Sequence, residues 1–322
     1  MAVAKNEEGE VGIVIRVENL TKYYGKRLAV DNINFSIEKG EIVGFLGPNG
    51  AGKTTTMRMI SGYLMPNQGQ VWIGDYNMEL QPLQGKRLIG YLPELVPLYS
   101  DMTTHAYLKF AARLKGLDKT KTRLRIEEVV AQCALEEYVD VLLGQLSKGF
   151  KQRVGLAQAI IHDPEVLILD EPTIGIDPRQ VAQTRALIKS LGQARTILLS
   201  THVLPEVSMI CERIIIIHEG KILAQDRIEN LSTLLKGGNQ LRLKIQGPSD
   251  KVSASLRTIA SVGEVRYEHP VHIVGFHADN EAQAEINEML VHNGWTLLSM
   301  EVVQMSLEEI FLKLTSEEEV DR

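Results

Sequence analysis

The sequence predicts an α/β protein: a parallel sheet with an antiparallel β subdomain and a helical insertion, followed by a small C-terminal α+β domain. One observation is a glycine-rich loop, GPNGAGKT, between a strand-like and a helix-like segment. A second is the return of strand-length apolar runs at Val166–Glu171, Arg195–His202 and Arg213–Gly220. Such runs are typical of strands buried on both faces of a parallel sheet. The third is the order β-α-β-β-α-β near the C-terminus.

The first domain begins with short strands. Val11–Leu20 and Ile33–Glu38 are rich in β-branched residues and predict the antiparallel subdomain. Glu41–Gly47 is a strand that leads directly into the glycine-rich loop and then into the helix TTTMRMI. A strand, a loop and a helix therefore follow one another at the point where a phosphate could bind.

A helical insertion of about residues 98–162 interrupts the parallel core. Apolar residues recur in it with the 3–4 spacing of an amphipathic helix. In its first helix we expect these residues to face the core: Ala106, Phe110, Leu114 and Leu117. In its second helix we expect the same of Leu124, Val129, Val130 and Cys133.

The segment KGGNQ, Lys236–Gln240, predicts a linker between two domains. The first domain spans residues 11–235, with its parallel core ending near Ala224. The second spans residues 239–322 and ends in a helix that opens with a capping box, in which Ser306 caps and Glu309 reaches back.

Composition excludes several classes of protein. The net charge of −6 argues against a nucleic-acid partner, which usually requires a basic surface. Cys133 and Cys211 are the only cysteines, so no disulfide framework is implied and a reducing compartment fits. The polar N-terminus has no signal-peptide core, and no apolar run approaches the length of a bilayer span. We therefore expect a soluble protein whose role at a membrane would need a partner.

The loop GPNGAGKT matches the phosphate-binding pattern G-x-x-x-x-G-K-[ST]. Its glycines let backbone N–H groups turn toward a phosphate, and the helix that follows adds a partial positive charge. Lys53 is placed to reach the β- and γ-phosphates, and the Thr54 hydroxyl is placed to hold Mg²⁺. The candidate nucleotide-binding residues of this segment are Gly47, Pro48, Asn49, Gly50, Ala51, Gly52, Lys53, Thr54 and Thr55.

Polar side chains end two of the predicted strands at the edge where open parallel sheets bind their ligands. Asp170 and Glu171 end the run VLILDE, and His202 ends the run RTILLSTH. Asp170 is suited to hold Mg²⁺, and Glu171 to act as the general base on the attacking water. His202 is suited to sense the γ-phosphate. Asp177, in TIGIDP, is by itself a common turn residue.

A second anion-binding pattern, LSKGFKQR, lies in the helical insertion. Ser147 is a good helix cap, and Gly149 permits a close approach to an anion at the start of a helix that runs to about Ile161. Taken alone, the segment fits an ordinary capped helix with basic residues equally well.

The order GPNGAGKT, LSKGF, VLILDE, GID and the final histidine resembles the motifs of ABC-type ATPases. The spacing is similar too, because Ser147 lies 23 residues before Asp170 and His202 lies 31 residues after Glu171. The resemblance covers about Val11–Ala224 and implies a P-loop NTPase fold with ATP and Mg²⁺ as cofactors.

The resemblance also implies roles for single residues. Tyr24, in KYYGK, stacks on adenine, and Glu94, in GYLPE, stands where the family has a glutamine that faces Mg²⁺ or water. The implied metal ligands are Thr54, Asp170 and Glu94. Lys148 and Phe150 depart from the family pattern, which has glycine and glutamine there. The serine and the second glycine of the motif remain, so we expect the γ-phosphate contact to survive.

In this family two ATPase domains sandwich the nucleotide head to tail, and one supplies GPNGAGKT while the other supplies the LSKGF segment. One such domain per chain implies a homodimer or pairing with a second ATPase. The resemblance further implies a membrane-spanning permease as partner and a cytoplasmic location, peripheral on the cytoplasmic face of the cell membrane. GYLPE and the C-terminal MSLEEIFLKLT resemble export systems for drugs, polysaccharides or gliding motility.

Two other functions compete with this one. Soluble ABC ATPases that act on ribosomes or DNA usually carry two ATPase domains or a long coiled coil, and this sequence has neither. A P-loop kinase or GTPase leaves LSKGFKQR unexplained.

In the C-terminal domain His269, His272 and His277 lie close in sequence, but a structural role is favoured over a metal site. The roles open to that domain are dimerisation and regulation.

Overall fold

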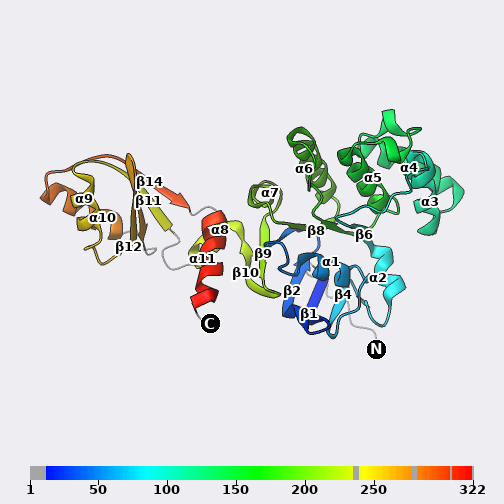
Figure 1. Ribbon diagram of the computed structural model, residues 1–322, viewed down its shortest axis with the longest axis horizontal. Helices are drawn as coiled ribbons and strands as arrows, with labels where there is room; N and C mark the ends of the chain where they lie inside the picture. The colour runs from blue at the N-terminus through cyan, green and yellow to red at the C-terminus, as the bar shows by residue number, and fades with distance from the viewer. Residues whose placement is uncertain (1–11, 235–238, 277–280, 305–306, 321–322) are drawn as a thin grey trace. The chain divides into compact units, whose positions relative to one another are not determined.

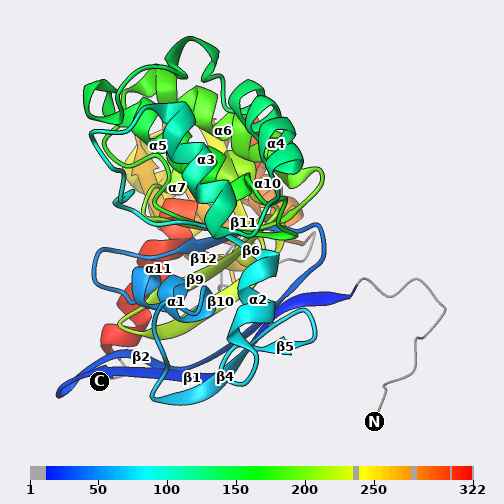
Figure 2. The ribbon, with the colours of Figure 1, turned by 90° about the vertical axis from the view of Figure 1, so that its right-hand side faces the viewer.

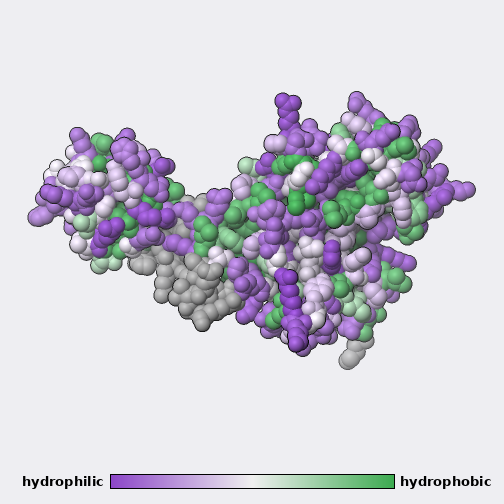
Figure 3. All heavy atoms as spheres, in the orientation of Figure 1, coloured by the Kyte–Doolittle hydropathy of each residue, from purple (hydrophilic) through white to green (hydrophobic). Residues whose placement is uncertain are grey.

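The chain divides between Ala224 and Gln225 into two compact units. The computed structural model describes residues 12–234, 239–276, 281–304 and 307–320 (Figure 1). Within those ranges no helix is both long and apolar enough to cross a bilayer. On the face drawn in Figure 3, polar side chains predominate and apolar ones gather in small patches.

A six-stranded sheet in the first unit confirms the predicted parallel core. Its strands, in spatial order, are β10 (Lys221–Arg227), β9 (Arg213–His218), β3 (Ile42–Leu46), β8 (Thr196–Thr201), β7 (Val166–Asp170) and β6 (Ile89–Leu92). The five strands from β9 to β6 run parallel. Every residue of β7 and β8 is buried, as expected of strands covered on both faces.

The predicted antiparallel subdomain is a second sheet of the same unit. Its strands, in spatial order, are β2 (Arg27–Glu38), β1 (Ile13–Tyr24), β4 (Gln68–Ile73) and β5 (Tyr76–Asn77), and neighbours are antiparallel. Helix α1 (Lys53–Ile60) buries Met57 and Ile60 in the core that the two sheets share. In the same core the ring centroids of Phe35 and Phe45 lie 5.7 Å apart, so β2 packs against β3 just before the glycine-rich loop.

The remaining α-helices of the unit are α2 (Pro82–Leu88), α3 (Thr104–Leu114), α4 (Lys119–Gln132), α5 (Lys148–Ile160), α6 (Pro178–Gly192) and α7 (Leu204–Ile210). The helices α3, α4 and α5 contact one another and form the predicted helical insertion. Figure 2 shows them grouped away from the antiparallel sheet.

The buried face predicted for α3 is wrong. Leu108 is fully buried, whereas Leu114 is 71% exposed and Phe110 is 38% exposed. The buried face combines Tyr107 and Leu108 with the small residues Ala111 and Ala112, whereas the residues chosen from the spacing lie on a neighbouring face. In the second helix the predicted residues Val129, Val130 and Cys133 are buried, but Leu124 is 46% exposed.

The second unit confirms the order β-α-β-β-α-β. Its elements along the chain are β11 (Asn239–Gln246), α9 (Ser249–Leu256), β12 (Val262–Glu268), β13 (Val271–Phe276), α10 (Glu281–His292) and β14 (Thr296–Gln304). The strands form one antiparallel sheet in the order β12-β13-β11-β14. Val252 of α9 and Ile286 of α10 are buried against this sheet.

Two further helices, α8 (Ile228–Leu234) and α11 (Leu307–Val320), contact each other within the second unit. The boundary between the two units falls within β10, whereas the sequence placed it at residue 235. Ser306, the expected cap of the last helix, and His277 lie outside the described residues.

We predict that Leu108→Ala lowers the free energy of unfolding by about 2–5 kcal/mol, because it leaves a cavity under α3. Leu114→Ala on the same helix should change it by less than about 0.5 kcal/mol, since this side chain is mostly exposed. Urea unfolding followed by circular dichroism measures both. Equal losses in the two variants would contradict the burial pattern of α3.

Candidate active site

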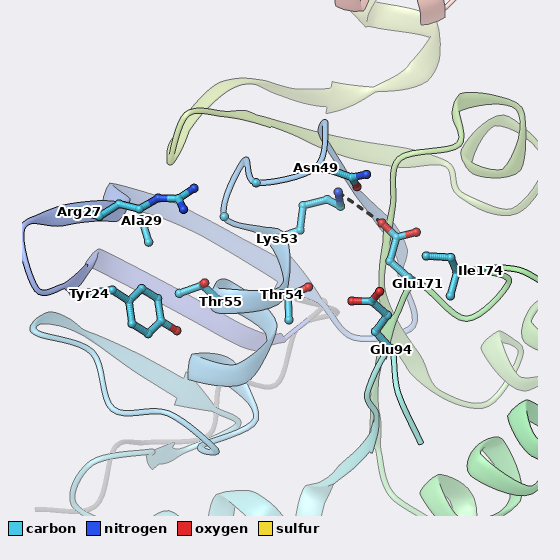
Figure 4. A pocket seen from close by; sticks show the side chains of 12 residues that line it. Tyr24, Arg27, Ala29, Asn49, Lys53, Thr54, Thr55, Glu94, Glu171 and Ile174 are labelled. Atoms are coloured by element: carbon cyan, nitrogen blue, oxygen red, sulfur yellow. Dashed lines mark ion pairs between the residues drawn. The ribbon is translucent and has the colours of Figure 1, made fainter. Parts of the chain in front are cut away.

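A cavity of about 470 Å³ lies over the glycine-rich loop. It is lined by Tyr24, Arg27, Ala29, Asn49, Gly50, Gly52, Lys53, Thr54, Thr55, Glu94, Glu171 and Ile174. Figure 4 shows Tyr24 and Arg27 at one end and the two glutamates with Ile174 at the other. Lys53, Thr54 and Thr55 lie between them, at the start of α1. The cavity therefore passes from an exposed aromatic ring to a cluster of charges.

The glycine-rich loop turns so tightly that its last glycine cannot be replaced without strain. Gly52 has a φ of +109°, and a Cβ there would lie 2.6 Å from the carbonyl oxygen of Ala29. This glycine precedes α1, whose first backbone N–H groups have no partner within the helix. Lys53, Thr54 and Thr55 of that helix start line the cavity, so these donors could bind an anion there.

Lys53 is buried at the floor of the loop, with 5% of its surface exposed. Its Nζ donates to the carbonyl oxygens of Gly47, at 2.7 Å, and Pro48, at 3.2 Å. It also lies 3.3 Å from Oε1 of Glu171. The Lys53 ammonium is thus held by two carbonyl oxygens of the loop and by the carboxylate of Glu171, the residue that follows β7.

Asp170 is fully buried at the end of β7. Its Oδ1 accepts hydrogen bonds from Ser200, at 2.6 Å, and from Thr54, at 3.3 Å, while its Oδ2 is buried without a partner. Burial raises the pKa of Asp170, the two hydrogen bonds act against that rise, and the charges of Glu94 and Glu171 add to it. A buried carboxylate oxygen without a partner, beside a threonine hydroxyl, suits a hard divalent cation.

Glu171 follows Asp170 with a φ of +49°, a conformation that non-glycine residues rarely adopt and that is often found at functional sites. The backbone N–H of Glu171 donates to the carbonyl oxygen and to the hydroxyl of Ser200, each at 3.1 Å. Nδ1 of His202 lies 2.9 Å from its Oε2. The Glu171 carboxylate is therefore buried between His202 and Lys53.

The segment LSKGF lies apart from this cavity. Ser147 caps α5 by accepting a hydrogen bond from the N–H of Phe150 at 3.4 Å, and neither Ser147 nor Gly149 lines the cavity. Within its own chain Gly149 lies against the side-chain amide of Gln180 in α6, since a Cβ there would lie 1.7 Å from the Oε1 atom. The capping role predicted for Ser147 is confirmed, and the serine itself is exposed.

The two residues that depart from the family pattern have contacts of their own. The ring of Phe150 lies 3.9 Å from that of Tyr138, and the guanidinium of Arg153 lies over it at 5.3 Å. The side chain of Lys148 ends beside Gly175, where a Cβ would lie 2.3 Å from its Nζ. Phe150 therefore packs within the helical insertion, and Lys148 crosses to the turn before α6.

Four residues that the sequence analysis did not select belong to this region. Arg27, Ala29 and Ile174 line the cavity, and the Ser200 hydroxyl donates to the Asp170 carboxylate and accepts from the backbone N–H of Glu171. Strand pairing explains two of them, because Arg27 pairs with Tyr24 across the β1–β2 turn and Ser200 pairs with Asp170. Aligning the polar ends of the two apolar runs would have placed Ser200 beside Asp170.

Other polar residues singled out in the sequence are structural. Asp177 caps α6 by accepting hydrogen bonds from Arg179 and Gln180, each at 3.1 Å. His272 is buried, with its Nε2 at 3.3 Å from the carbonyl oxygen of Ser249. No group of three or more His, Cys, Asp or Glu residues in the described part of the chain could hold a metal.

We predict that Asp170→Asn stabilises the nucleotide-free protein in EDTA by about 1–3 kcal/mol near neutral pH, because it removes a buried charge. Burial raises the pKa of this carboxyl above 3.8, so stability falls as the pH rises past the value at which the unfolded chain ionises, and it levels off once the folded protein ionises as well. The gain should therefore be small below about pH 4 and grow above it. Urea midpoints measure it, with the exposed Asp101→Asn as the control. A gain that stays constant with pH would contradict this account.

Comparison with known proteins agrees with this geometry. Residues 30–174 match the ABC transporter family. The chain is 34% identical over 306 residues to the linearmycin resistance ATP-binding protein LnrL of Bacillus subtilis (strain 168), an alignment that covers 94% of this chain and 98% of that protein. It is 36% identical over 304 residues to the bacitracin transport ATP-binding protein BcrA of Bacillus licheniformis, covering 94% and 97% respectively.

Solved structures show the same fold. An ATP-binding subunit of an ABC transporter is 29% identical, with a TM-score of 0.63 over 69% of this chain and 92% of that one. The dimeric post-hydrolysis state of the ATP-binding cassette MJ0796, bound to ADP and phosphate, is 25% identical, with a TM-score of 0.61 over 66% and 98%. The chain therefore belongs to the family of ABC transporter ATP-binding subunits, which are ATP hydrolases.

Proposed function

We propose that the cavity binds ATP with its adenine against Tyr24 and its phosphates in the glycine-rich loop. One observation carries this proposal: the cavity runs from an exposed aromatic ring to a buried lysine and two glutamates (Figure 4). Lys53 would exchange its contacts with the loop carbonyls and Glu171 for the β- and γ-phosphates. Arg27, at the Tyr24 end, would add a positive charge beside the nucleotide.

The residues that would hold Mg²⁺ are Thr54, Asp170 and Glu94. The buried Oδ2 of Asp170, which has no partner, supports this assignment, and Glu94 lines the same end of the cavity. When bound, Mg²⁺ would neutralise negative charge on the β- and γ-phosphates. Because glutamate keeps the side-chain oxygen of the family's glutamine, Glu94 can fill the same place with an added charge.

Glu171 would act as the general base on the attacking water. Its carboxylate is buried, and His202 would keep it at the phosphate end of the cavity once Lys53 has moved to the phosphates. A base that is already positioned accepts the proton without first being reoriented. His202 would orient Glu171 and contact the γ-phosphate. Its side chain is 37% exposed, which leaves it within reach of the ligand.

Ser147 and Gly149 would complete the nucleotide site of a second ATPase domain, most simply that of a second copy of this chain. Two observations support this: neither residue lines the cavity of its own chain, and Ser147 is exposed at the start of α5. The free N–H groups of that helix start would then face a γ-phosphate. A dimeric ATP-binding cassette is among the structural neighbours.

As an ABC transporter subunit, the chain would drive a separate membrane-spanning permease from the cytoplasmic face of the membrane. Export is the direction that the relatives support, since they include a resistance protein, a bacitracin transport protein and the Nod factor export ATP-binding protein I of Ralstonia nicotianae. The first unit, predicted from the sequence to span residues 11–235, would form the ATPase domain, and the second, predicted to span residues 239–322, would form an accessory domain. None of these relatives favours work on ribosomes or DNA, and the net charge of −6 opposes a nucleic-acid partner.

We predict that Ser147→Arg lowers ATP hydrolysis by about 100-fold or more, because it blocks the phosphate contact made to the partner. ATP binding by the single chain should stay within about twofold of wild type. Phosphate release and equilibrium ATP binding measure the two effects. Thr103→Arg, which removes the cap of α3 in the same insertion, is the control for loss of a cap. If Ser147→Arg weakened ATP binding and Thr103→Arg did not, Ser147 would belong to the nucleotide site of its own chain.

We predict that Glu171→Gln traps ATP, because the site still binds nucleotide but has lost its base. About one ATP per chain should remain bound through gel filtration in Mg²⁺. Adding Lys53→Ala or Ser147→Arg to this variant should release it. If trapped ATP survived Ser147→Arg, the second domain would not be part of the site.

A further inference from the structure

Glu206, in the first turn of α7, is a buried carboxylate to which the proposed mechanism gives no role. Only 7% of its surface is exposed. Burying an ionisable side chain is costly unless the protein supplies partners for it. Its Oε2 accepts a hydrogen bond from the hydroxyl of Thr173 at 2.5 Å and a longer one from the hydroxyl of Thr201 at 3.5 Å. Both threonines are buried too, so the contacts lie in the protein interior.

The place of Glu206 in its helix would ordinarily indicate a capping role. A glutamate three residues after the N-cap often reaches back to the backbone N–H of the N-cap residue. Here that residue is Val203, and its N–H donates instead to the hydroxyl of Thr201 at 3.0 Å. The Glu206 carboxylate therefore does not make the capping contact and binds Thr173, 33 residues earlier in the chain.

The two threonines belong to the two segments that carry the candidate base and its histidine. Thr173 lies two residues after Glu171, and Thr201 directly precedes His202. The segments already touch at the active site, because Nδ1 of His202 lies 2.9 Å from Oε2 of Glu171. Glu206 adds a second contact between the same two segments, outside the cavity.

We propose that Glu206 is a positioning residue that binds Thr173 and Thr201 and thereby holds Glu171 against His202. This inference deepens the proposed function and rests on it, since it takes Glu171 as the general base. Glu206 itself touches neither nucleotide nor water in this account. It acts only by fixing how far the two segments can move apart.

Two features of Glu171 explain why such support is needed. Its φ of +49° is a conformation that persists in a non-glycine residue only when the surrounding structure imposes it. Its contact with Lys53, at 3.3 Å, would be lost when that lysine moves to the phosphates of ATP. The base would then depend on His202 and on the contacts that keep the two segments together.

Thr173→Val tests the contact, because valine resembles threonine in shape but has no hydroxyl. We expect kcat for ATP hydrolysis in Mg²⁺ to fall about tenfold, since a small displacement of a positioned group costs rate. Equilibrium ATP binding should stay within about twofold of wild type, because the loop that binds the phosphates is unchanged. Thr173→Ser keeps the hydroxyl and should restore kcat to within about threefold of wild type.

The matched control is Thr122→Val in α4. Thr122 is also buried, and its hydroxyl donates to the carbonyl oxygen of Leu117 at 3.4 Å, within the helical insertion. This variant should lose stability to urea in the same way as Thr173→Val, because each breaks one buried hydrogen bond. Its kcat should stay within about twofold of wild type.

The double variant Thr173→Val with Glu206→Leu separates positioning from mere stability. Glu206→Leu alone leaves the buried hydroxyl of Thr173 without its partner and should lower the urea midpoint. Replacing both partners by apolar side chains should recover much of that midpoint. The kcat of the double variant should nevertheless stay as low as that of Glu206→Leu, because Thr173 acts only through Glu206.

Recovery of kcat together with the urea midpoint in the double variant would overturn the proposal and leave Glu206 a structural residue. So would an unchanged kcat in Thr173→Val, or a further loss of about tenfold when Thr173→Val is added to Glu206→Leu. A wild-type chain that hydrolyses no ATP would overturn the proposed function and this role together. Normal hydrolysis and ATP trapping by Glu171→Gln, with no effect of Thr173→Val, would overturn the role of Glu206 alone.

Discussion

The burial of two carboxylates at the end of β7 is the constraint on which the active site depends. Asp170 and Glu171 lie where charge is costly unless it is paired, and the neighbouring elements supply the partners. Ser200 comes from β8, Lys53 from α1, and His202 from the segment after β8. One oxygen of Asp170 still has no partner. A cation bound to this oxygen would therefore also stabilise the folded chain.

The topology of the sheet explains why these groups meet. The loop follows β3, the carboxylates end β7 and the histidine follows β8, and these three strands are parallel neighbours. Their carboxyl ends consequently share one edge, where open α/β sheets bind ligands. The antiparallel sheet adds Tyr24 and Arg27 at the far end of the same cavity. A single cavity is thus built from two sheets that share a hydrophobic core.

The sequence revealed the parts of the site that depend on local spacing. A glycine-rich loop before a helix and carboxylates after an apolar strand are contiguous patterns, so they can be recognised without knowing the fold. Arg27 and Ser200 could not be selected in that way, because strand pairing alone brings them to the site. The buried face of α3 was misjudged for a related reason, since small alanines contribute to it and carry little hydrophobic signal. The glycine at position 149 was explained by an anion, yet its contact with Gln180 is invisible until α5 and α6 are placed.

That last contact has a mechanical consequence. The side-chain amide of Gln180 lies against Gly149, and the side chain of Lys148 ends beside Gly175, so the start of α5 contacts both α6 and the turn before it. That turn begins directly after Glu171, only a few residues along the chain from these contacts. In a pair of such chains, a nucleotide bound against Ser147 would therefore act close to the base of the neighbouring site.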